Sequence, residues 1–451
     1  MALEDPNSES TLRRSAQTPT GTRHWVVVFA VTLAMITYID RVCISQAAPH
    51  IREALGLNDA EMGKIFAAFG LAYALFEIPT GWWGDSLGPR KVLMRIVLWW
   101  SVFTALTGQV RSFAMLWVTR FMFGAGEAGC FPNLTKTFTL WLPKAERTRA
   151  QSIMWMSARW GGAFTPLLVV WIFTLVTWRN AFAVFGVLGV IWAVIFYAWF
   201  RDRPREHPGF NEAELELLQD NEGNIAGHAP MPWRRLVASP TVWGLWGQYF
   251  CISYGWYFYI TWLPTYLQEA RGLTLEKGGV MGVLMTGAPL FLGGIGCLLA
   301  GVVLGWLLRH SFSVTFSRRL LGCVGCTAAS GLLLWSAYIH NPWLAMLSMG
   351  LAGFANDLTL PGAWATCMDV GGRFAGTLSG SMNMMGNFGG MAGPLVVGYI
   401  LHFTNRNWEI TFWLSSAIYF LGGLCWLIID PVTPLEVAKE GKVPSREPVP
   451  T

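Results

Sequence analysis

Charged residues are scarce in this chain of 451 residues, where Asp, Glu, Lys and Arg together make up 13%. A soluble protein has roughly a quarter of its residues charged, so this scarcity excludes a soluble domain of ordinary composition. Hydrophobic residues make up 53% of the chain, which also contains 49 Gly and 25 Trp. Because glycine and interfacial aromatic residues are enriched in membrane proteins, the composition predicts a protein that crosses a membrane many times.

Several kinds of functional site are missing from the sequence as well. It contains no nucleophile–base constellation, metal-ligand cluster or nucleotide motif, so it does not indicate an enzyme. None of the seven His lies in the middle of an apolar segment, and any proton carrier must therefore be a carboxylate. Cys323 and Cys326 form a C-x-x-C pair, but without a second pair or a nearby His they indicate packing rather than a metal or redox site. The first 24 residues contain no apolar segment, and we expect no cleaved signal peptide.

Apolar segments of about 20 residues, long enough to span a bilayer as helices, recur along the chain. Twelve are expected, at residues 25–47, 62–83, 92–110, 114–138, 150–176, 180–200, 241–268, 279–305, 317–338, 343–367, 374–402 and 409–430. The polar stretch 201–240 separates the sixth segment from the seventh. It divides the chain into two six-helix halves, 25–200 and 241–430, with tails at 1–24 and 431–451.

Positive charges are unevenly distributed between the two sides that these segments define. About two thirds of the 32 Lys and Arg fall on the side that carries both termini and the stretch 201–240. The positive-inside rule assigns the richer side to the cytoplasm, so both termini and this linker are expected there. Within the linker, Asn211 and Glu214 form a capping-box-like pair that predicts a short helix joining the halves.

Two short stretches indicate an internal repeat. SARWGGAFTP (157–166) and MGNFGGMAGP (385–394) each place a Gly-Gly pair four residues before a Pro. They lie in the fifth and eleventh segments, which are equivalent positions of the two halves. Parallel repeats of this kind occur in transporters whose substrate site lies between the halves near the midplane. The repeat also places Arg159 opposite Asn387.

Ionisable residues inside the apolar segments are costly to bury and are therefore candidates for function. The first half contains Asp40, Arg41, Glu77, Arg120, Glu127 and Arg159, whereas the second half has Asp357. Adjacent residues on a helix point about 100° apart, so Asp40 and Arg41 cannot face the same partner. A simple arrangement pairs Asp40 with one arginine and leaves another arginine free to bind a carboxylate or phosphate.

The buried acids also indicate coupling to protons. Burial favours the neutral form of a carboxyl group and a nearby arginine favours the charged form. A carboxylate that alternates between these surroundings can take up and release a proton, and Asp40 and Glu127 are the candidates. The alternative is that Asp40 and Arg120 form a static ion pair that ties two helices together.

The turn GWWGDSLGPRK at residues 81–91 resembles the loop signature of the major facilitator superfamily. The matching residues are Gly81, Asp85, Gly88, Arg90 and Lys91, whereas Ser86 replaces the usual arginine. Such a turn forms a cytoplasmic gate motif in which Asp85 can cap a helix and pair with arginines. The equivalent turn in the second half has Gly305 in place of the acid, so a gate there would depend on other contacts.

Longer stretches resemble the anion:cation symporter family of that superfamily. They are IDRVCIS (39–45), RFMFGAGEAGCFP (120–132), WLPKAERTRA (141–150), RDRPREHPGFNEAELE (201–216) and WATCMDVGGRFAGTLSGSMNMMGNFGGMAGP (364–394). The resemblance implies an all-α membrane protein of twelve transmembrane helices in two six-helix pseudo-symmetric bundles. It also implies symport of a small organic anion, such as an aldonate, hexuronate or aldarate, with protons and without a cofactor.

The resemblance further implies roles for individual residues. Arg41 would contact the substrate carboxylate, and the residues that would line the ligand site with it are Tyr73, Gln248, Asn383 and Asn387. Asp40 and Glu127 would couple transport to protons, together with the arginine Arg120. Asparagine amides offer donors and acceptors that suit the hydroxyl groups of a sugar acid.

Arg159 departs from the family, whose members usually carry a small or neutral polar residue at this place. Two hypotheses remain open: Arg159 binds a second anionic group of the substrate, or it pairs with Glu77 or another buried acid.

Other functions also remain open. An organophosphate or anion exchanger would use the same arginines, whereas the arginine surplus argues against a drug:proton antiporter. A receptor or scaffold would need an extra domain or a longer tail. The expected partners are a small organic anion and the lipid bilayer, without nucleic acid, for a monomer in a bacterial inner membrane.

Overall fold

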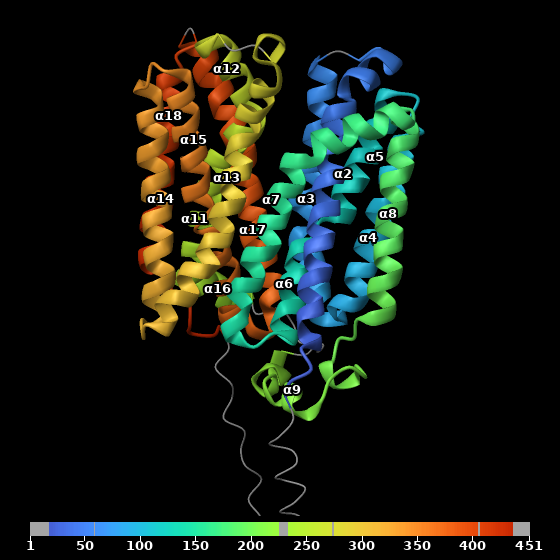
Figure 1. Cartoon of the computed structure of the whole chain (residues 1–451), viewed down its shortest axis with the longest axis vertical. Coiled ribbons are helices and arrows are strands. Elements are labelled where there is room, and N and C mark those ends of the chain that lie inside the picture. Colours follow the sequence, from blue (N-terminus) through green and yellow to red (C-terminus); the bar gives the residue numbers. More distant parts are fainter. Residues whose placement is uncertain (1–17, 58, 225–232, 273–274, 405, 436–451) are drawn as a thin grey trace, which may run out of the picture.

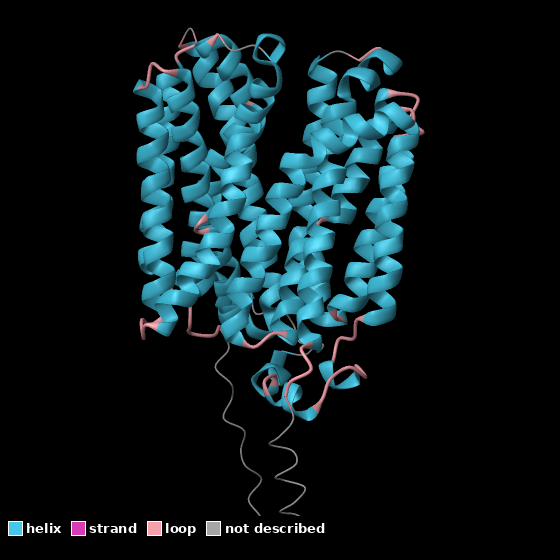
Figure 2. Ribbon diagram, viewed as in Figure 1, coloured by secondary structure: helices cyan, strands magenta, loops and turns pink. Residues whose placement is uncertain are grey.

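The computed structural model describes residues 18–57, 59–224, 233–272, 275–404 and 406–435. Most of the two expected tails (1–17 and 436–451) and part of the expected linker (225–232) lie outside these ranges. The described residues are almost entirely helical, and Figure 2 draws no strand among them. The expectation of an all-α protein is therefore confirmed.

Long apolar helices make up each half of the molecule. The first half consists of α2 (Trp25–Leu55), α3 (Asp59–Leu87), α4 (Pro89–Thr107), α5 (Phe113–Glu127), α6 (Cys130–Trp141), α7 (Lys144–Leu175) and α8 (Trp178–Trp199). The second half consists of α11 (Pro240–Thr261), α12 (Leu263–Arg271), α13 (Leu275–Arg309), α14 (Val314–Tyr338), α15 (Pro342–Asp357), α16 (Leu360–Gly371), α17 (Ala375–Phe403) and α18 (Trp408–Ile428). Seven described helical stretches are long and apolar enough to cross a membrane by these two measures alone, and one of them, Pro342–Leu401, contains several helices of the second half.

Polar side chains cap the starts of several of these helices. Ser112 accepts a hydrogen bond from the backbone N–H of Met115 at the start of α5, and Ser313 accepts one from Phe316 at the start of α14. These bonds satisfy N–H groups that the helix itself leaves unpaired. Each of these two caps marks where its helix begins.

The two halves stand side by side (Figure 1). Helices α3 and α17 pack together across the interface, as do α7 and α13. The ribbons of the halves lie close together at the end that carries residues 201–224, here called the linker side, and diverge toward the opposite end (Figure 1). Polar contacts between the halves are therefore expected in the middle and on the linker side.

One helix in each half is interrupted at an equivalent place. In the first half α5 ends at Glu127 and α6 begins at Cys130, and Gly129 between them has a φ of 81°. In the second half α15 ends at Asp357 and α16 begins at Leu360. An acid at a helix C-terminus is disfavoured by the helix dipole. Both breaks thus hold a carboxylate where helix stability alone would not select one.

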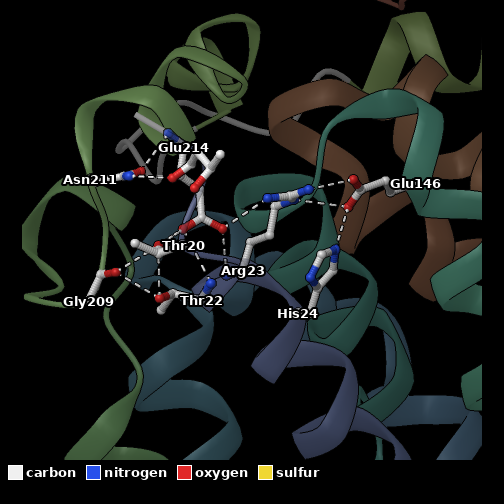
Figure 3. Close-up of polar contacts among 9 residues, drawn as sticks. Thr20, Thr22, Arg23, His24, Glu146, Gly209, Asn211 and Glu214 are labelled. Atoms are coloured by element: carbon white, nitrogen blue, oxygen red, sulfur yellow. Dashed lines mark hydrogen bonds and ion pairs between the residues drawn. The ribbon is translucent and has the colours of Figure 1, made fainter. Parts of the chain in front are cut away.

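The linker is fastened to the first half by a buried glutamate (Figure 3). It contains the short helix α9 (Glu212–Glu216), which Asn211 caps by accepting from the N–H of Glu214 at 3.0 Å. The buried Glu214 carboxylate accepts from the hydroxyl of Thr20, from the backbone N–H of Thr22 at 3.2 Å and from the guanidinium of Arg23 at 3.0 Å. The capping box is thus incomplete, because Glu214 binds the chain before α2 instead of its own cap.

Arg23 also connects the linker to the start of α7. Its guanidinium also donates to both oxygens of Glu146, at 3.1 and 2.9 Å. Burial raises the pKa of Glu146, but the hydrogen bonds and charges of Arg23 and His24 lower it by more, so the net pKa lies below the ordinary value of 4.5. The linker, the chain before α2 and the start of α7 therefore form one polar cluster.

Candidate substrate site between the halves

Arg41 lies halfway along α2 at the centre of a group of aromatic rings. Its guanidinium carbon is 4.7 Å from the ring centroid of Tyr73 and 5.6 Å from that of Tyr38. Its Nε donates to Glu127 at 2.5 Å, while its Nη2 has no hydrogen-bond partner among the described residues. The side chain is 22% exposed, whereas Glu127 is fully buried. Arg41 thus keeps a free donor in a partly open position beside its counter-ion.

Among the described residues, the expected pairing of Asp40 with an arginine does not occur. Asp40 is buried, and neither of its carboxylate oxygens has a hydrogen-bond partner among the described residues. Arg120 is also buried; its guanidinium carbon stacks 4.1 Å from the ring of Phe123, and its Nε has no hydrogen-bond partner within the described part of the chain. The ion pair between α2 and the interrupted helix is instead made by Arg41, which binds Glu127.

Arg159 is paired with the second buried acid. Its Nε and Nη2 donate to the two oxygens of Asp357 at 2.7 and 3.1 Å, so a fork-shaped ion pair joins α7 of the first half to α15 of the second. Its Nη1 donates to the hydroxyl of Tyr38 at 3.0 Å, and its guanidinium carbon lies 3.7 Å from the ring of Trp256. Of the partners that the sequence left open for Arg159, the structure has Asp357 and not Glu77.

Glu77 on α3 makes a second polar contact between the halves. It accepts from the amide of Asn383 on α17 and from the backbone N–H of Gly129 at 2.8 Å. That N–H is exposed by the break between α5 and α6, where the left-handed backbone of Gly129 favours glycine. Glu77 therefore links the helix break of the first half to the second half.

The other residues predicted to bind the ligand differ in their hydrogen-bond partners. The hydroxyl of Tyr73 has no partner among the described residues. The amide of Asn387 donates to the backbone oxygen of Asn383 at 2.9 Å and accepts from Tyr257 at 3.5 Å. Gln248 is fully buried and its amide nitrogen contacts the sulfur of Met382 at 3.9 Å, so it packs between α11 and α17 in this conformation.

On the linker side, Asp85 holds the halves together. Its carboxylate accepts from the backbone N–H groups of Gly376 and Thr377 at 3.0 and 2.6 Å and from the Thr377 hydroxyl at 2.7 Å, at the start of α17. The ammonium group of Lys136 lies 3.3 Å away. Asp85 thus caps a helix, as the turn predicts, but the cap lies across the interface and its cation is a lysine rather than an arginine.

The other residues of the predicted gate motif have different partners. A side chain on Gly81 would meet the backbone oxygen of Gly376 at 2.5 Å, so this close approach of α3 and α17 requires glycine. Gly88 lies beside Asp202, and the backbone N–H of Arg90 donates to Asp202 at 2.9 Å. The Arg90 guanidinium donates to the backbone oxygen of Tyr197 at 3.1 and 2.7 Å, within the first half. Arg90 therefore connects α4 to α8 and does not pair with Asp85.

Asp369 supplies a carboxylate on the linker side of the second half, where the second-half turn itself has Gly305 in place of an acid. It accepts from Arg147 of the first half at 2.9 Å and from Arg318 of the second half at 2.6 Å. Asn221 of the linker accepts from the same Arg147 guanidinium at 2.7 Å. This contact explains how the linker-side interface forms although Gly305 stands where an acid was expected.

Several residues of the site did not emerge from the sequence. Tyr38 could have been found, because it lies three residues before Arg41 and so on the same helix face. Lys136 lies inside the expected apolar segment 114–138 and so carried the same signal as the other buried charges, whereas Trp256 gave none, since its contact depends on how the halves pack. Among the described residues, no group of three or more metal-ligating side chains is present.

Comparisons with known proteins agree with this architecture. Residues 30–394 match the Major Facilitator Superfamily. The chain is 36% identical to the probable sulfoacetate transporter SauU of Cupriavidus necator, over 93% of this chain and 96% of that protein. It is 30% identical to the D-galactonate transporter of Escherichia coli, over 92% and 97%, and 30% identical to the probable galactarate/D-glucarate transporter GudP of Bacillus subtilis, over 95% and 97%.

A solved structure has a similar fold. The crystal structure of the human organic anion transporter MFSD10 superposes with a TM-score of 0.68 at 15% identity, over 90% of this chain and 99% of that one. Together with the family match, this likeness confirms the expected fold of two six-helix bundles.

Proposed function

The chain belongs to the Major Facilitator Superfamily, groups there with transporters of organic acids and is not an enzyme, and from this premise we propose that it carries a small organic anion together with protons. The relatives are described as transporters of sulfoacetate, galactonate, galactarate and glucarate. We place the substrate of this chain in the same chemical range, a small sugar acid or a comparable carboxylate or sulfonate.

The observation that carries the proposal is the state of Arg41. A guanidinium in a partly open, low-dielectric site, with one nitrogen unbonded and aromatic rings around it, is a receptor for a carboxylate. Tyr73, Asn383 and Asn387 would add hydrogen bonds to the substrate's hydroxyl groups. Gln248 would join them when α11 shifts relative to α17.

Proton coupling rests on the two carboxyl groups next to this receptor. Glu127 holds Arg41, so an incoming anion competes with it for the guanidinium. Protonation of Glu127 removes the competing charge and frees Arg41 for the substrate. Asp40 is buried without a hydrogen-bond partner, a situation that is far less costly for a neutral carboxyl group than for an ion. Arg120 would receive the Asp40 carboxylate once that proton leaves.

Alternating access follows from the contacts of the two ends. We assign the linker side to the cytoplasm, because positive charge is concentrated there. The contacts of Asp85 and Asp369 then close the cytoplasmic end, and the protein is in an outward-facing state in a multi-pass cell membrane. Substrate and proton must each change the balance between this state and its inward-facing counterpart.

A thermal-stability screen of the purified protein tests this proposal. A ligand that binds the folded state raises the apparent melting temperature, so sugar acids, sulfonates, phosphate esters and lipophilic cations are compared at about pH 5.5 and 7.5. Stabilisation by organic acids that is lost in Arg41→Ala and kept in Arg90→Ala is the expected result. Stabilisation by lipophilic cations, with none by any organic anion, would contradict the proposal.

A further inference from the structure

The ion pair of Arg159 and Asp357 repeats the ion pair of Arg41 and Glu127 in the other half of the fold. Glu127 and Asp357 are each the last residue of the first segment of an interrupted helix, α5 and α15. Each carboxylate is fully buried and binds an arginine through a short contact, 2.5 Å for Glu127 and 2.7 Å for Asp357. The molecule thus holds two arginine–carboxylate pairs built on the same structural feature.

Tyr38 connects the two pairs. Its ring lies 5.6 Å from the guanidinium carbon of Arg41, and its hydroxyl accepts from Nη1 of Arg159 at 3.0 Å. Both cations therefore lie next to the same tyrosine side chain. A ligand that engages both of them would need one anionic group for each.

We propose that Arg159 is the receptor for a second anionic group, so that the preferred substrates are dianions with acid groups at both ends of a short chain. This inference rests on the proposed function and names the substrate class of the same site. Arg159 is held by Asp357 as Arg41 is held by Glu127, and one guanidinium can exchange a protein carboxylate for a substrate carboxylate or sulfonate of similar geometry.

Charge balance at the second pair requires a proton. A second anion next to the Asp357 carboxylate would leave one uncompensated negative charge in a low-dielectric site, so a proton is expected to accompany the second anion. The titratable side chains around Asp357 are Arg159, Cys297, Tyr249, Tyr259 and Tyr419. Of these, the arginine is the one that carries charge at neutral pH. Asn356 donates to Asp357 at 2.8 Å and keeps the carboxyl group in place while Arg159 turns to the substrate.

Exchange at this pair also acts on the contact between the halves. Arg159 belongs to the first half and Asp357 to the second, so their fork-shaped bond ties α7 to α15. A dianion that takes over Arg159 loosens this tie, whereas a monoanion bound at Arg41 leaves it intact. The strength of the contact between the halves would therefore depend on whether the substrate has a second acid group.

The experiment compares gluconate with glucarate, which have the same carbon chain and differ in one terminal carboxylate. Their affinities are measured by calorimetry or ligand-induced stabilisation on the full chain, for the wild type, Arg159→Gln, and the double variant Arg159→Gln/Asp357→Asn. The double variant removes both charges together, so it does not leave a buried carboxylate without its cation. Asp357→Asn alone removes the competing charge and keeps the arginine.

The wild type is expected to prefer glucarate. Both variants without Arg159 should lose this preference by about 10- to 100-fold, the range for a charge-assisted hydrogen bond, because glucarate affinity should fall by more than gluconate affinity. Asp357→Asn should keep the preference for glucarate. An unchanged glucarate-to-gluconate ratio in both Arg159 variants would overturn the inference and leave the pair a structural tie. Failure of the wild type to bind any organic anion would overturn the proposed function itself.

Discussion

Asp85 offers the strongest test of how the halves are held together on the linker side. Its carboxylate accepts three hydrogen bonds from Gly376 and Thr377 at the start of α17, and Lys136 lies 3.3 Å away. Asp85→Asn keeps the shape of the side chain and one acceptor oxygen but removes the charge. Hydrogen bonds to charged groups contribute about 1.5–3 kcal/mol and those between neutral groups about 0.5–1.5 kcal/mol.

Converting these contacts from charged to neutral is therefore expected to weaken the closed linker side by about 2–3 kcal/mol. Because 1.4 kcal/mol corresponds to a factor of ten, the ratio of closed to open molecules should fall roughly 30- to 140-fold. The substitution also leaves the buried Lys136 without its anion, which acts in the same direction.

The assay measures the distance between spin labels on the two halves. Leu87 and Phe312 are exposed, and each lies at the linker-side end of its half, so cysteines there report whether the halves separate. The control is Asp202→Asn, because Asp202 accepts from the backbone of Arg90 at 2.9 Å without crossing the interface. A new population at longer distance in Asp85→Asn, and not in the control, is expected. The same distance distribution in wild type and Asp85→Asn would show that the Asp85 contacts do not hold the linker side closed.

Two further predictions concern the folded state. Gly129→Ala should lower the melting temperature, since Gly129 has a φ of 81° and a Cβ there would lie 2.2 Å from the Thr80 hydroxyl. The matched control is Gly70→Ala, whose added Cβ meets open space and should leave the melting temperature nearly unchanged. The attachment of the linker should weaken in acid. The pKa of Glu146 is lowered below 4.5, so the Glu146 carboxylate stabilises the attachment fully above pH 4.5 and loses this effect as the pH falls through its lowered pKa. Hydrogen exchange of residues 201–224 between about pH 6 and 3.5 should show this loss, and Glu146→Gln should reduce the pH dependence.

The sequence predicted the architecture well because that depends on signals that a single chain carries. Apolar segments of spanning length, the polar stretch at 201–240 and the repeat at Gly161 and Gly389 all concern local composition or spacing. The turn around Asp85 also indicated a helix cap. The sequence could not indicate that the helix capped by Asp85 belongs to the other half, because this contact depends on how α3 and α17 pack.

Pairing among the buried charges was predicted less well. The expected bond between Asp40 and an arginine is replaced by one between Arg41 and Glu127, because the break after Glu127 turns that carboxylate toward α2. Helical periodicity assumes a continuous helix, and neither interruption was foreseen although Gly129 and Pro361 stand beside them. The partner of Arg159 was left open for a related reason, since Asp357 comes from a helix about 200 residues away whose position only the packing of the halves determines.

The most direct test of the account measures proton movement together with substrate. The protein is reconstituted into liposomes that contain a pH-sensitive dye, and the organic acid that stabilises it most is added outside. We expect acidification of the lumen with the wild type. With Glu127→Gln we expect no acidification, although the acid still stabilises that variant. Uptake of the acid without any proton movement in the wild type would contradict the claim that this chain couples organic anion transport to protons.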